Sequence, residues 1–524
     1  MKQVSPTELR TAIVSGGEIA LLDLREELPF SERHLLHARS LPLSRLELRV
    51  AALVPRRATR IVLCDDGDGL VAKGARRLAV FGYSDVAALD GGVAGWEKAG
   101  FPLFSGVNVP SKAFGEFVEH TNGTPSIAAE ELHRLIEERH KLVVLDSRPF
   151  DEFQRVSIPT GIDTPGAELV LRARDLVPDP ETLVVVNCAG RTRSIIGAQS
   201  LINAGLPNRV VALRNGTMGW SLAGYAPDHG QDRRAPLPSP AGLAWARAAA
   251  ARVAQRCEVA RIDVAALARF REDVARTTYL FDVRDPAEYA AGHLPGAVSA
   301  PGGQLVQATD QYVGTLGARL VLVDPLEVRA LMTASWLKQM GWNDVFVLAA
   351  EGRETGQPRP AVPGYDPDAA PGIDAGALAA LLARDAATVI DLANSRTFRD
   401  GHIEGAWFAI RARLDRALAR VPLRGTLVLT SEDGVLAALA APEAQALTPT
   451  PVRCLAGGTA AWVASGRGLV KGADTMADEP IDVWLKAYER STGVRAAMEE
   501  YLAWEIDLLH RIEQDGTCRF RTLS

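Results

Sequence analysis

The sequence predicts an α/β protein made of four tandem domains, each a doubly wound parallel sheet flanked by helices. First, 524 residues are too many for one hydrophobic core, because single cores stop growing near about 250–300 residues. Second, one set of sequence landmarks recurs four times along the chain. Third, the apolar runs in each repeat are continuous in Val, Leu and Ile, which is typical of strands buried on both faces of a parallel sheet.

Three landmarks mark each repeat. The first is an apolar run that ends in an aspartate, at Asp23, Asp146, Asp282 and Asp391. The second is a run that ends 41, 42, 42 and 40 residues later, at Cys64, Cys188, Asp324 and Ser431. The third is a run followed by Gly-Gly and Trp, which is clear in repeats one and four, looser in two and lost in three. The spacing predicts that equivalent landmarks superpose at strand ends, where open α/β sheets bind ligands.

The landmarks and the breaks between them divide the chain. Helices are expected between strands at amphipathic segments such as 130–139, 195–204 and 331–340. We expect domains at residues 1–106, 124–228, 259–365 and 372–470, a Pro-rich linker with an Ala-rich helix at 229–258, a Pro/Gly break near 360–372 and a helical tail at 471–524. In the tail, Met498, Leu502, Ile506 and Leu509 share one face, which predicts packing on a neighbouring domain or on a second chain.

Composition excludes several classes of protein. A net charge of −6 does not favour a nucleic-acid or anionic-membrane partner, and no apolar run approaches the roughly 20 residues of a membrane span. The N-terminus lacks the apolar core of a signal peptide, and five widely spaced cysteines are not a disulfide framework, so we expect a cytoplasmic protein. His34, His293 and His402 lie in separate repeats, so we expect structural hydrogen bonds there and no metal or cofactor.

The landmarks resemble those of the rhodanese family. The family's early motif, which runs from Asp-x-Arg to Gly-His-Ile-Pro-Gly-Ala, is similar to DVRDPAEYAAGHLPGA in the third repeat, Asp282 to Ala297. The other repeats carry departing versions of it, and in the fourth Ala393 replaces the arginine. The resemblance covers roughly residues 1–470. It implies a five-stranded parallel sheet in each repeat and a catalytic cysteine in the loop after the second-run strand.

The loop after Cys188 contains the groups that sulfur transfer needs. The nucleophile is a thiolate, which nearby cations and a helix N-terminus favour. Gly190 permits a tight curl of backbone N–H groups, and Ser194 is expected to cap a helix at 195–204. These groups also suit an anionic donor such as thiosulfate. We therefore expect Cys188 to be catalytic, and the donor to bind at Ala189, Gly190, Arg191, Thr192, Arg193 and Ser194.

The other three loops are expected to be weak or inactive. Cys64 is followed by Asp65, Asp66 and Asp68, and like charge raises a thiol pKa and repels anions. Asp324 and Ser431 stand where the family has cysteine, and neither side chain can hold a persulfide. The third and fourth domains are therefore interpreted as inactive copies kept for packing or binding.

The sequence thus predicts a thiosulfate sulfurtransferase that passes sulfur through a Cys188 persulfide to cyanide or a thiol. Its expected partners are a small-molecule donor and acceptor, and a homo-oligomer through the tail is one way to bury the tail's apolar face. Two alternatives stay open: a 3-mercaptopyruvate sulfurtransferase, and a sulfur-binding or scaffold protein without activity. A phosphatase or arsenate reductase is disfavoured, because its loop needs Arg six positions after the cysteine, where this chain has Ser194.

Overall fold

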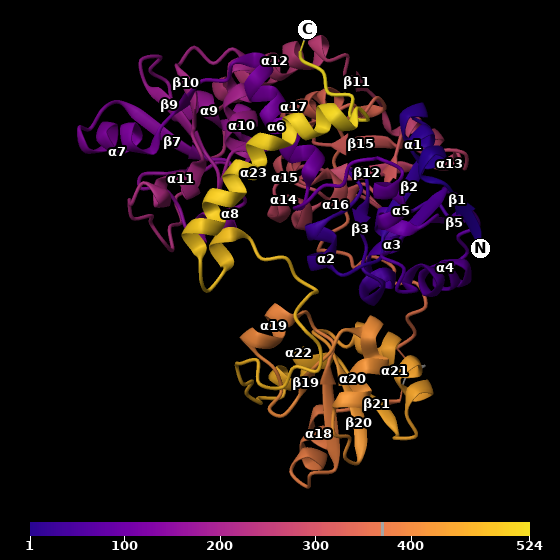
Figure 1. Ribbon diagram of the computed structural model, residues 1–524. Helices are drawn as coiled ribbons and strands as arrows, with labels where there is room; N and C mark the ends of the chain where they lie inside the picture. Colours follow the sequence, from indigo (N-terminus) through magenta and orange to yellow (C-terminus); the bar gives the residue numbers. More distant parts are fainter. Residues whose placement is uncertain (368–370, 524) are drawn as a thin grey trace.

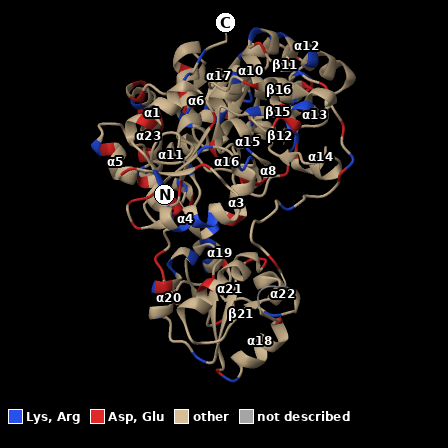
Figure 2. Ribbon diagram, turned by 90° about the vertical axis from the view of Figure 1, so that its right-hand side faces the viewer, with Lys and Arg blue, Asp and Glu red and all other residues tan. Residues whose placement is uncertain are grey.

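The computed structural model describes residues 1–367 and 371–523, and the described residues form four α/β repeats. Repeats 1 to 3 gather in one body, and repeat 4 (orange) lies below it, joined by two extended segments (Figure 1). Figure 2 shows the same separation from the side, with acidic and basic residues interspersed over both bodies. The Pro/Gly break predicted near 360–372 lies partly outside the described residues.

Repeats 1 and 2 alternate strands and helices along the chain. Repeat 1 contains β1 (Lys2–Val4), α1 (Pro6–Ser15), β2 (Ile19–Asp23), α2 (Glu27–Glu32), β3 (Arg39–Ser40), α3 (Leu46–Leu53), β4 (Ile61–Cys64), α4 (Leu70–Val80), β5 (Val86–Leu89) and α5 (Gly92–Lys98). Helix α6 (Val109–Asn122) leads into repeat 2. That repeat contains β6 (Ser126–Ile127), α7 (Ala129–Glu137), β7 (Leu142–Asp146), α8 (Phe150–Arg155), β8 (Ile162–Asp163), α9 (Leu169–Leu176), β9 (Leu183–Asn187), α10 (Thr192–Ala204), β10 (Val210–Leu213) and α11 (Gly216–Leu222).

Helix α12 (Pro240–Arg256) connects to repeats 3 and 4. Repeat 3 contains β11 (Ala260–Arg261), α13 (Val264–Glu272), β12 (Thr278–Asp282), α14 (Pro286–Ala291), β13 (Val298–Ser299), α15 (Gly302–Gln307), α16 (Thr309–Tyr312), β14 (Thr315–Leu316), β15 (Arg319–Val323), α17 (Val328–Gln339) and β16 (Val345–Leu348). Repeat 4 contains β17 (Gly372–Ile373), α18 (Ala375–Leu382), β18 (Ala387–Asp391), α19 (Ser395–Asp400), β19 (Trp407–Phe408), α20 (Leu414–Arg420), β20 (Thr426–Thr430), α21 (Val435–Leu447), β21 (Val452–Leu455) and α22 (Gly458–Ala464).

The sheets confirm the predicted fold class. In repeat 2 the parallel strand order is β6-β10-β9-β7-β8, and the other repeats follow the same order. The Val184–Val186 stretch of β9 is fully buried, as expected for a central strand covered on both faces. Strand β9 therefore delivers the residue that follows it to the carboxyl edge of the sheet, where α/β folds bind ligands.

The sheet of repeat 1 differs from the expected five strands, because β14 of repeat 3 adds a sixth. Strand β14 pairs antiparallel with β2 through Thr315 opposite Ala20 and Leu316 opposite Ile19. The short β3 pairs only with Leu22 and Asp23 at the other end of β2. Strand β14 thus covers an edge that would otherwise be unpaired. The two repeats keep separate sheets that are joined by backbone hydrogen bonds.

The tail ends in helix α23 (Val494–Asp515), which packs across α6 within the same chain (Figure 1). Its buried stripe contains Met498, Leu502, Glu505, Leu508 and Ile512. The predicted face is partly wrong, because Ile506 is 56% exposed and the buried glutamate takes the central position of the stripe. No helix in the described part of the chain is long and apolar enough to cross a membrane.

Candidate active site

Strand pairing fixes which residues of the four repeats are equivalent. The aspartate that ends the first-run strand lies opposite Cys64 in repeat 1, Asn187 in repeat 2, Val323 in repeat 3 and Thr430 in repeat 4. The expected superposition of Cys64 on Cys188 is therefore wrong by one residue. Cys64 is the last residue of β4 and matches Asn187. The residue that matches Cys188 in repeat 1 is Asp65, in the loop that follows.

The repeated Gly-Gly motif supports this register. In repeats 1, 2 and 4 the second residue of the pair is a glycine that lies against the carbonyl oxygen of the residue at the cysteine position. A Cβ added at Gly92, Gly216 or Gly458 would lie 2.3, 2.4 or 2.1 Å from the carbonyl oxygen of Asp65, Cys188 and Ser431, respectively. No side chain fits at such distances, and all three glycines also have positive φ. The motif therefore brings the turn after the fifth strand directly against the loop.

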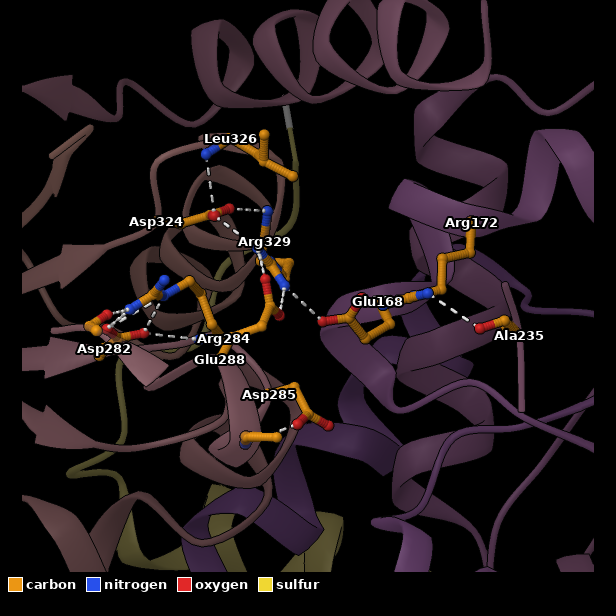
Figure 3. Close-up of polar contacts among 12 residues, drawn as sticks. Glu168, Arg172, Ala235, Asp282, Arg284, Asp285, Glu288, Asp324, Leu326 and Arg329 are labelled. Atoms are coloured by element: carbon orange, nitrogen blue, oxygen red, sulfur yellow. Dashed lines mark hydrogen bonds and ion pairs between the residues drawn. The ribbon is translucent and has the colours of Figure 1, made fainter. Parts of the chain in front are cut away.

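In repeats 1, 3 and 4 the side chain at the cysteine position binds the amides of its own loop. The Asp65 carboxylate accepts from the N–H groups of Gly67, at 2.9 Å, and Val71, at 3.0 Å. Asp324 accepts from Leu326, at 3.1 Å, and Arg329, at 2.9 Å (Figure 3). The Ser431 hydroxyl accepts from the N–H of Ala437. An internal oxygen atom thus takes amides that would otherwise face an anion.

Cys64 lies in an environment that opposes thiolate formation. The residue is fully buried, and its Sγ lies 3.8 Å from the carbonyl oxygen of Leu22. Burial, reinforced by the charge of Asp23, raises the pKa of the Cys64 thiol well above its usual range. This thiol is therefore protonated at neutral pH and shielded from solutes.

Cys188 occupies the first loop position after β9 and is 2% exposed. Its carbonyl oxygen accepts from the N–H and the hydroxyl of Thr217, at 2.8 and 3.1 Å, and its Sγ lies 3.5 Å from the Ser194 hydroxyl. Helix α10 begins at Thr192, so the expectation that Ser194 caps a helix starting at 195 is wrong. Ser194 lies in the first turn, and its hydroxyl donates to the carbonyl oxygen of Arg191 at 2.8 Å.

Both arginines of the loop are already bound by carboxylates. Arg191 is buried and donates through two nitrogens to Glu116 of α6, at 2.7 Å each, and also pairs with Glu119. Arg193 donates to Glu152 of α8 at 2.8 Å. Although burial opposes it, the Arg193 guanidinium and Lys486 hold the pKa of the Glu152 carboxyl well below its usual range. The two cations therefore stabilise the loop and do not project freely toward a ligand.

Segments outside repeat 2 complete a cleft of about 380 Å³ over Cys188. Besides the loop itself, its walls include Lys112 of α6, Gln304 of repeat 3, Arg396 of repeat 4, and Lys486 and Tyr501 of the tail. Sequence analysis missed these residues, together with Glu116, Glu152 and Glu505. The expected domain bounds leave residues 107–123 between the first two domains, and nothing in the tail's pattern indicated contact with a distant loop.

Glu505 explains how a glutamate occupies the buried stripe of α23. Its Oε1 lies 2.9 Å from Lys112 Nζ and accepts from Tyr501, at 3.0 Å, and Thr192, at 3.2 Å. Its Oε2 lies so close to the Cys188 loop that a Cβ at Gly190 would be 3.1 Å away. Gly190 thus permits close approach of the tail and does not adopt the left-handed conformation. Burial and then Glu505 raise the pKa of the Tyr501 hydroxyl well above its usual range.

The family of the chain follows from a comparison with protein-family models. The model of the rhodanese-like domain matches residues 5–99, 128–223, 264–350 and 374–465. The chain belongs to the rhodanese-like family.

Solved structures give a match over the whole chain. The crystal structure of a thiosulfate sulfurtransferase from Pseudomonas aeruginosa is 49% identical, with a TM-score of 0.97 and coverage of 100% of both chains. A rhodanese-related protein from Thermoplasma volcanium is 19% identical, covers 20% of this chain and 99% of its own, and has a TM-score of 0.18. Among curated protein sequences, none matches.

The early motif of the rhodanese-like repeats holds the loop scaffold together. Asp146 and Arg148 form a buried ion pair, with Nε and Nη2 of the arginine donating at 2.8 and 2.7 Å. His34, His293 and His402 each donate from Nδ1–H to the carbonyl oxygen of an aromatic residue four positions earlier and stack on its ring. These contacts confirm the predicted structural hydrogen bonds.

Proposed function

We propose that this rhodanese-like protein is a thiosulfate sulfurtransferase in which Cys188 carries the transferred sulfur as a persulfide. The observation that supports it most is the register of the four loops. Of the equivalent residues Asp65, Cys188, Asp324 and Ser431, Cys188 is the one whose side chain is a thiol. The full-length relative from Pseudomonas aeruginosa, described as a thiosulfate sulfurtransferase, supports the choice of reaction.

In the first half-reaction, the Cys188 thiolate attacks the outer sulfur of thiosulfate. A bond forms between Sγ and that sulfur, the sulfur–sulfur bond of thiosulfate breaks, and its electron pair leaves with sulfite. The total charge of minus three is conserved, because a thiolate and the thiosulfate dianion give a persulfide anion and a sulfite dianion. In the second half-reaction, cyanide or a thiolate attacks the outer sulfur and bonds to it. The sulfur–sulfur bond of the persulfide breaks, and its electron pair returns to Cys188 as a thiolate.

The loop Ala189–Ser194 is proposed to hold the anionic donor mainly through its backbone. Helix α10 is 13 residues long and begins at Thr192, so its N-terminal amides and dipole favour negative charge beside Cys188. Arg193 contributes charge at close range. Arg191 is assigned a different role from the one its sequence position suggests, because it is saturated by Glu116, Glu119 and Asn215 and fixes the loop on α6.

Repeats 1, 3 and 4 are proposed to carry no sulfur and to serve packing and the completion of the cleft. The proposed partners are a small-molecule donor and acceptor, which a cleft of about 380 Å³ accommodates. The proposed compartment is the cytoplasm, since five widely spaced cysteines do not form a disulfide framework.

The test is intact-mass spectrometry after thiosulfate treatment, followed by peptide mapping and a thiocyanate assay with cyanide as acceptor. We expect a gain of one sulfur atom on the peptide that contains Cys188, and loss of both the mass gain and thiocyanate formation in Cys188→Ser. A persulfide mapped to another cysteine, or turnover that survives in Cys188→Ser, would refute the proposal. Binding without any turnover in the wild type would favour the scaffold alternative.

A further inference from the structure

The charges around the cleft are unevenly balanced. Arg191 faces two carboxylates, Glu116 and Glu119. By contrast, the single Glu152 carboxylate is shared by two cations, because Arg193 Nη2 lies 2.8 Å and Lys486 Nζ 3.5 Å from it. One positive charge is therefore in surplus on the Arg193 side of the cleft. Lys112, the other lysine of the cleft, has its own carboxylate in Glu505 at 2.9 Å.

We propose that Lys486, a tail residue outside the four rhodanese-like repeats, is the cation that binds the anionic sulfur donor in the cleft above Cys188. Lys486 and Cys188 line the same cavity, and the lysine side chain is 41% exposed. Its 3.5 Å contact with Glu152 is long for a charged hydrogen bond, so turning toward a bound anion costs little. The inference rests on the proposed function for the identity of the donor, thiosulfate.

The position of Lys486 is fixed from two repeats through Glu489. The Glu489 carboxylate accepts from the backbone N–H of Lys486 at 3.1 Å. The same carboxylate pairs with Arg396 of repeat 4 at 2.9 Å and with Arg155 of repeat 2 at 3.6 Å. Repeat 4 thus contributes to the cleft by holding the turn that presents the lysine. Arg396 and Glu489 are positioning residues in this arrangement.

The first test measures the charge above Cys188 without any sulfur transfer. The rates of Cys188 alkylation by iodoacetate, an anion, and iodoacetamide, a neutral reagent of similar size, are followed by peptide mapping. Both rates depend equally on the thiolate fraction, so their ratio reports the local potential alone. In Lys486→Gln the iodoacetate-to-iodoacetamide ratio should fall by about threefold to tenfold, the worth of one charged contact in a half-exposed site. Lys486→Arg should restore it.

The matched control is Lys471→Gln, which removes the same charge from an exposed lysine of the tail that does not line the cleft. Its alkylation ratio should equal that of the wild type. An unchanged ratio in Lys486→Gln, or an equal fall of both alkylation rates, overturns the inference.

The second test uses turnover. Lys486→Gln should raise the KM for thiosulfate by a similar factor and leave kcat near the wild-type value, because the contact holds the donor before and during transfer. A fall in kcat at constant KM overturns the assignment. Wild-type protein that makes no thiocyanate would instead refute the proposed function, while the alkylation ratio continues to test the cation.

Discussion

A shift of one residue separates the thiol of repeat 1 from that of repeat 2. Aspartate-to-cysteine spacings of 41 and 42 residues look equivalent in a sequence, because loops vary in length by that amount. In the folded chain a one-residue shift moves a side chain from the loop to the end of the strand, where it faces the opposite side of the sheet. Cys64 therefore enters a buried core with Trp96, and Asp65 takes the loop position.

Replacing Cys64 should leave sulfur transfer intact. We expect Cys64→Ala to retain most thiosulfate turnover, because this thiol is buried and its pKa is raised well above the usual range. Alanine is used because a serine hydroxyl in this core would be buried without a partner. The measurement is thiocyanate formation beside Cys188→Ser. Equal loss in the two variants would mean that the thiols act as a relay.

The place of the Cys188 loop at the carboxyl edge of its sheet was predictable from sequence, but the partners of the loop were not. Cys188 and the residues after it form one continuous motif at the end of a strand, so the sequence alone made them the candidate site. Glu116, which binds Arg191, lies in α6 before the first strand of the repeat, and Glu152, which binds Arg193, lies in α8 after strand β7. Their spacing carries no pattern, and only packing brings them to the loop. Sequence reasoning therefore overestimated the free positive charge beside the sulfur.

Among the elements, α23 has a buried stripe that follows spacing rather than hydrophobicity. Residues 498, 502, 505, 508 and 512 are separated by three or four positions, as one helix face requires. Choosing only apolar residues excluded Glu505 and selected Ile506 instead. A glutamate occupies a buried stripe when a lysine neutralises it, as Lys112 does here. The presence of the helix was predictable, but its orientation depended on a partner in another helix.

Two substitutions on α23 distinguish these faces. Leu508→Ala should lower the free energy of unfolding by about 2–5 kcal/mol, because the side chain is fully buried against Phe104 and Val109. Ile506→Ala removes a similar side chain that is 56% exposed and should change it by less than about 0.5 kcal/mol. Urea unfolding of both variants provides the measurement. Equal effects would contradict the observed orientation of the helix.

Across the whole molecule, buried charge joins repeats as much as apolar contact does. Arg329 of α17 is 1% exposed and pairs with Asp324 of its own loop at 3.0 Å and with Glu168 of repeat 2 at 3.0 Å (Figure 3). A guanidinium held by carboxylates from two repeats fixes their relative position, since removing it breaks the contact with Glu168 and leaves the buried Asp324 carboxylate without its counterion.

Replacing Arg329 should therefore loosen the contact between repeats 2 and 3. We expect Arg329→Met to lower the stability of the native state by about 3–5 kcal/mol, measured as a shift of the urea midpoint. Arg261→Met is the control, since Arg261 is 47% exposed and its ion pair with Glu327 is worth less than about 1 kcal/mol. A shift no larger than that of the control would show that the buried network does not hold the repeats together.

Glu26, at the start of α2, should make stability depend on pH. Burial raises its pKa from 4.5 to about 7, and the nearby charges include Asp482 of the tail and Arg413 of repeat 4. The folded protein binds this proton more tightly than the unfolded chain, so its contribution is present below about pH 4.5 and is lost as pH rises through 7. Glu26→Gln should thus be more stable than the wild type at pH 8, by about 2–3 kcal/mol, and similar at pH 4.

Thermal unfolding of Glu26→Gln and the wild type between pH 4 and 8 measures this difference. Glu32→Gln, at an exposed position of the same helix, removes an equal charge and serves as the control. A stability difference that does not change with pH would contradict the assigned proton.

The cleft over Cys188 draws on residues as far apart in the chain as Lys112 and Tyr501, and this separation has a consequence during synthesis. A ribosome makes repeat 2 long before residues 484–501, and domains fold as they emerge. Until those residues are made, Cys188 of the nascent chain lacks Lys486 and Tyr501, which line the same cleft in the complete protein. Chains that stall early, or that a protease trims within the tail, therefore hold the thiol but not the chamber around it.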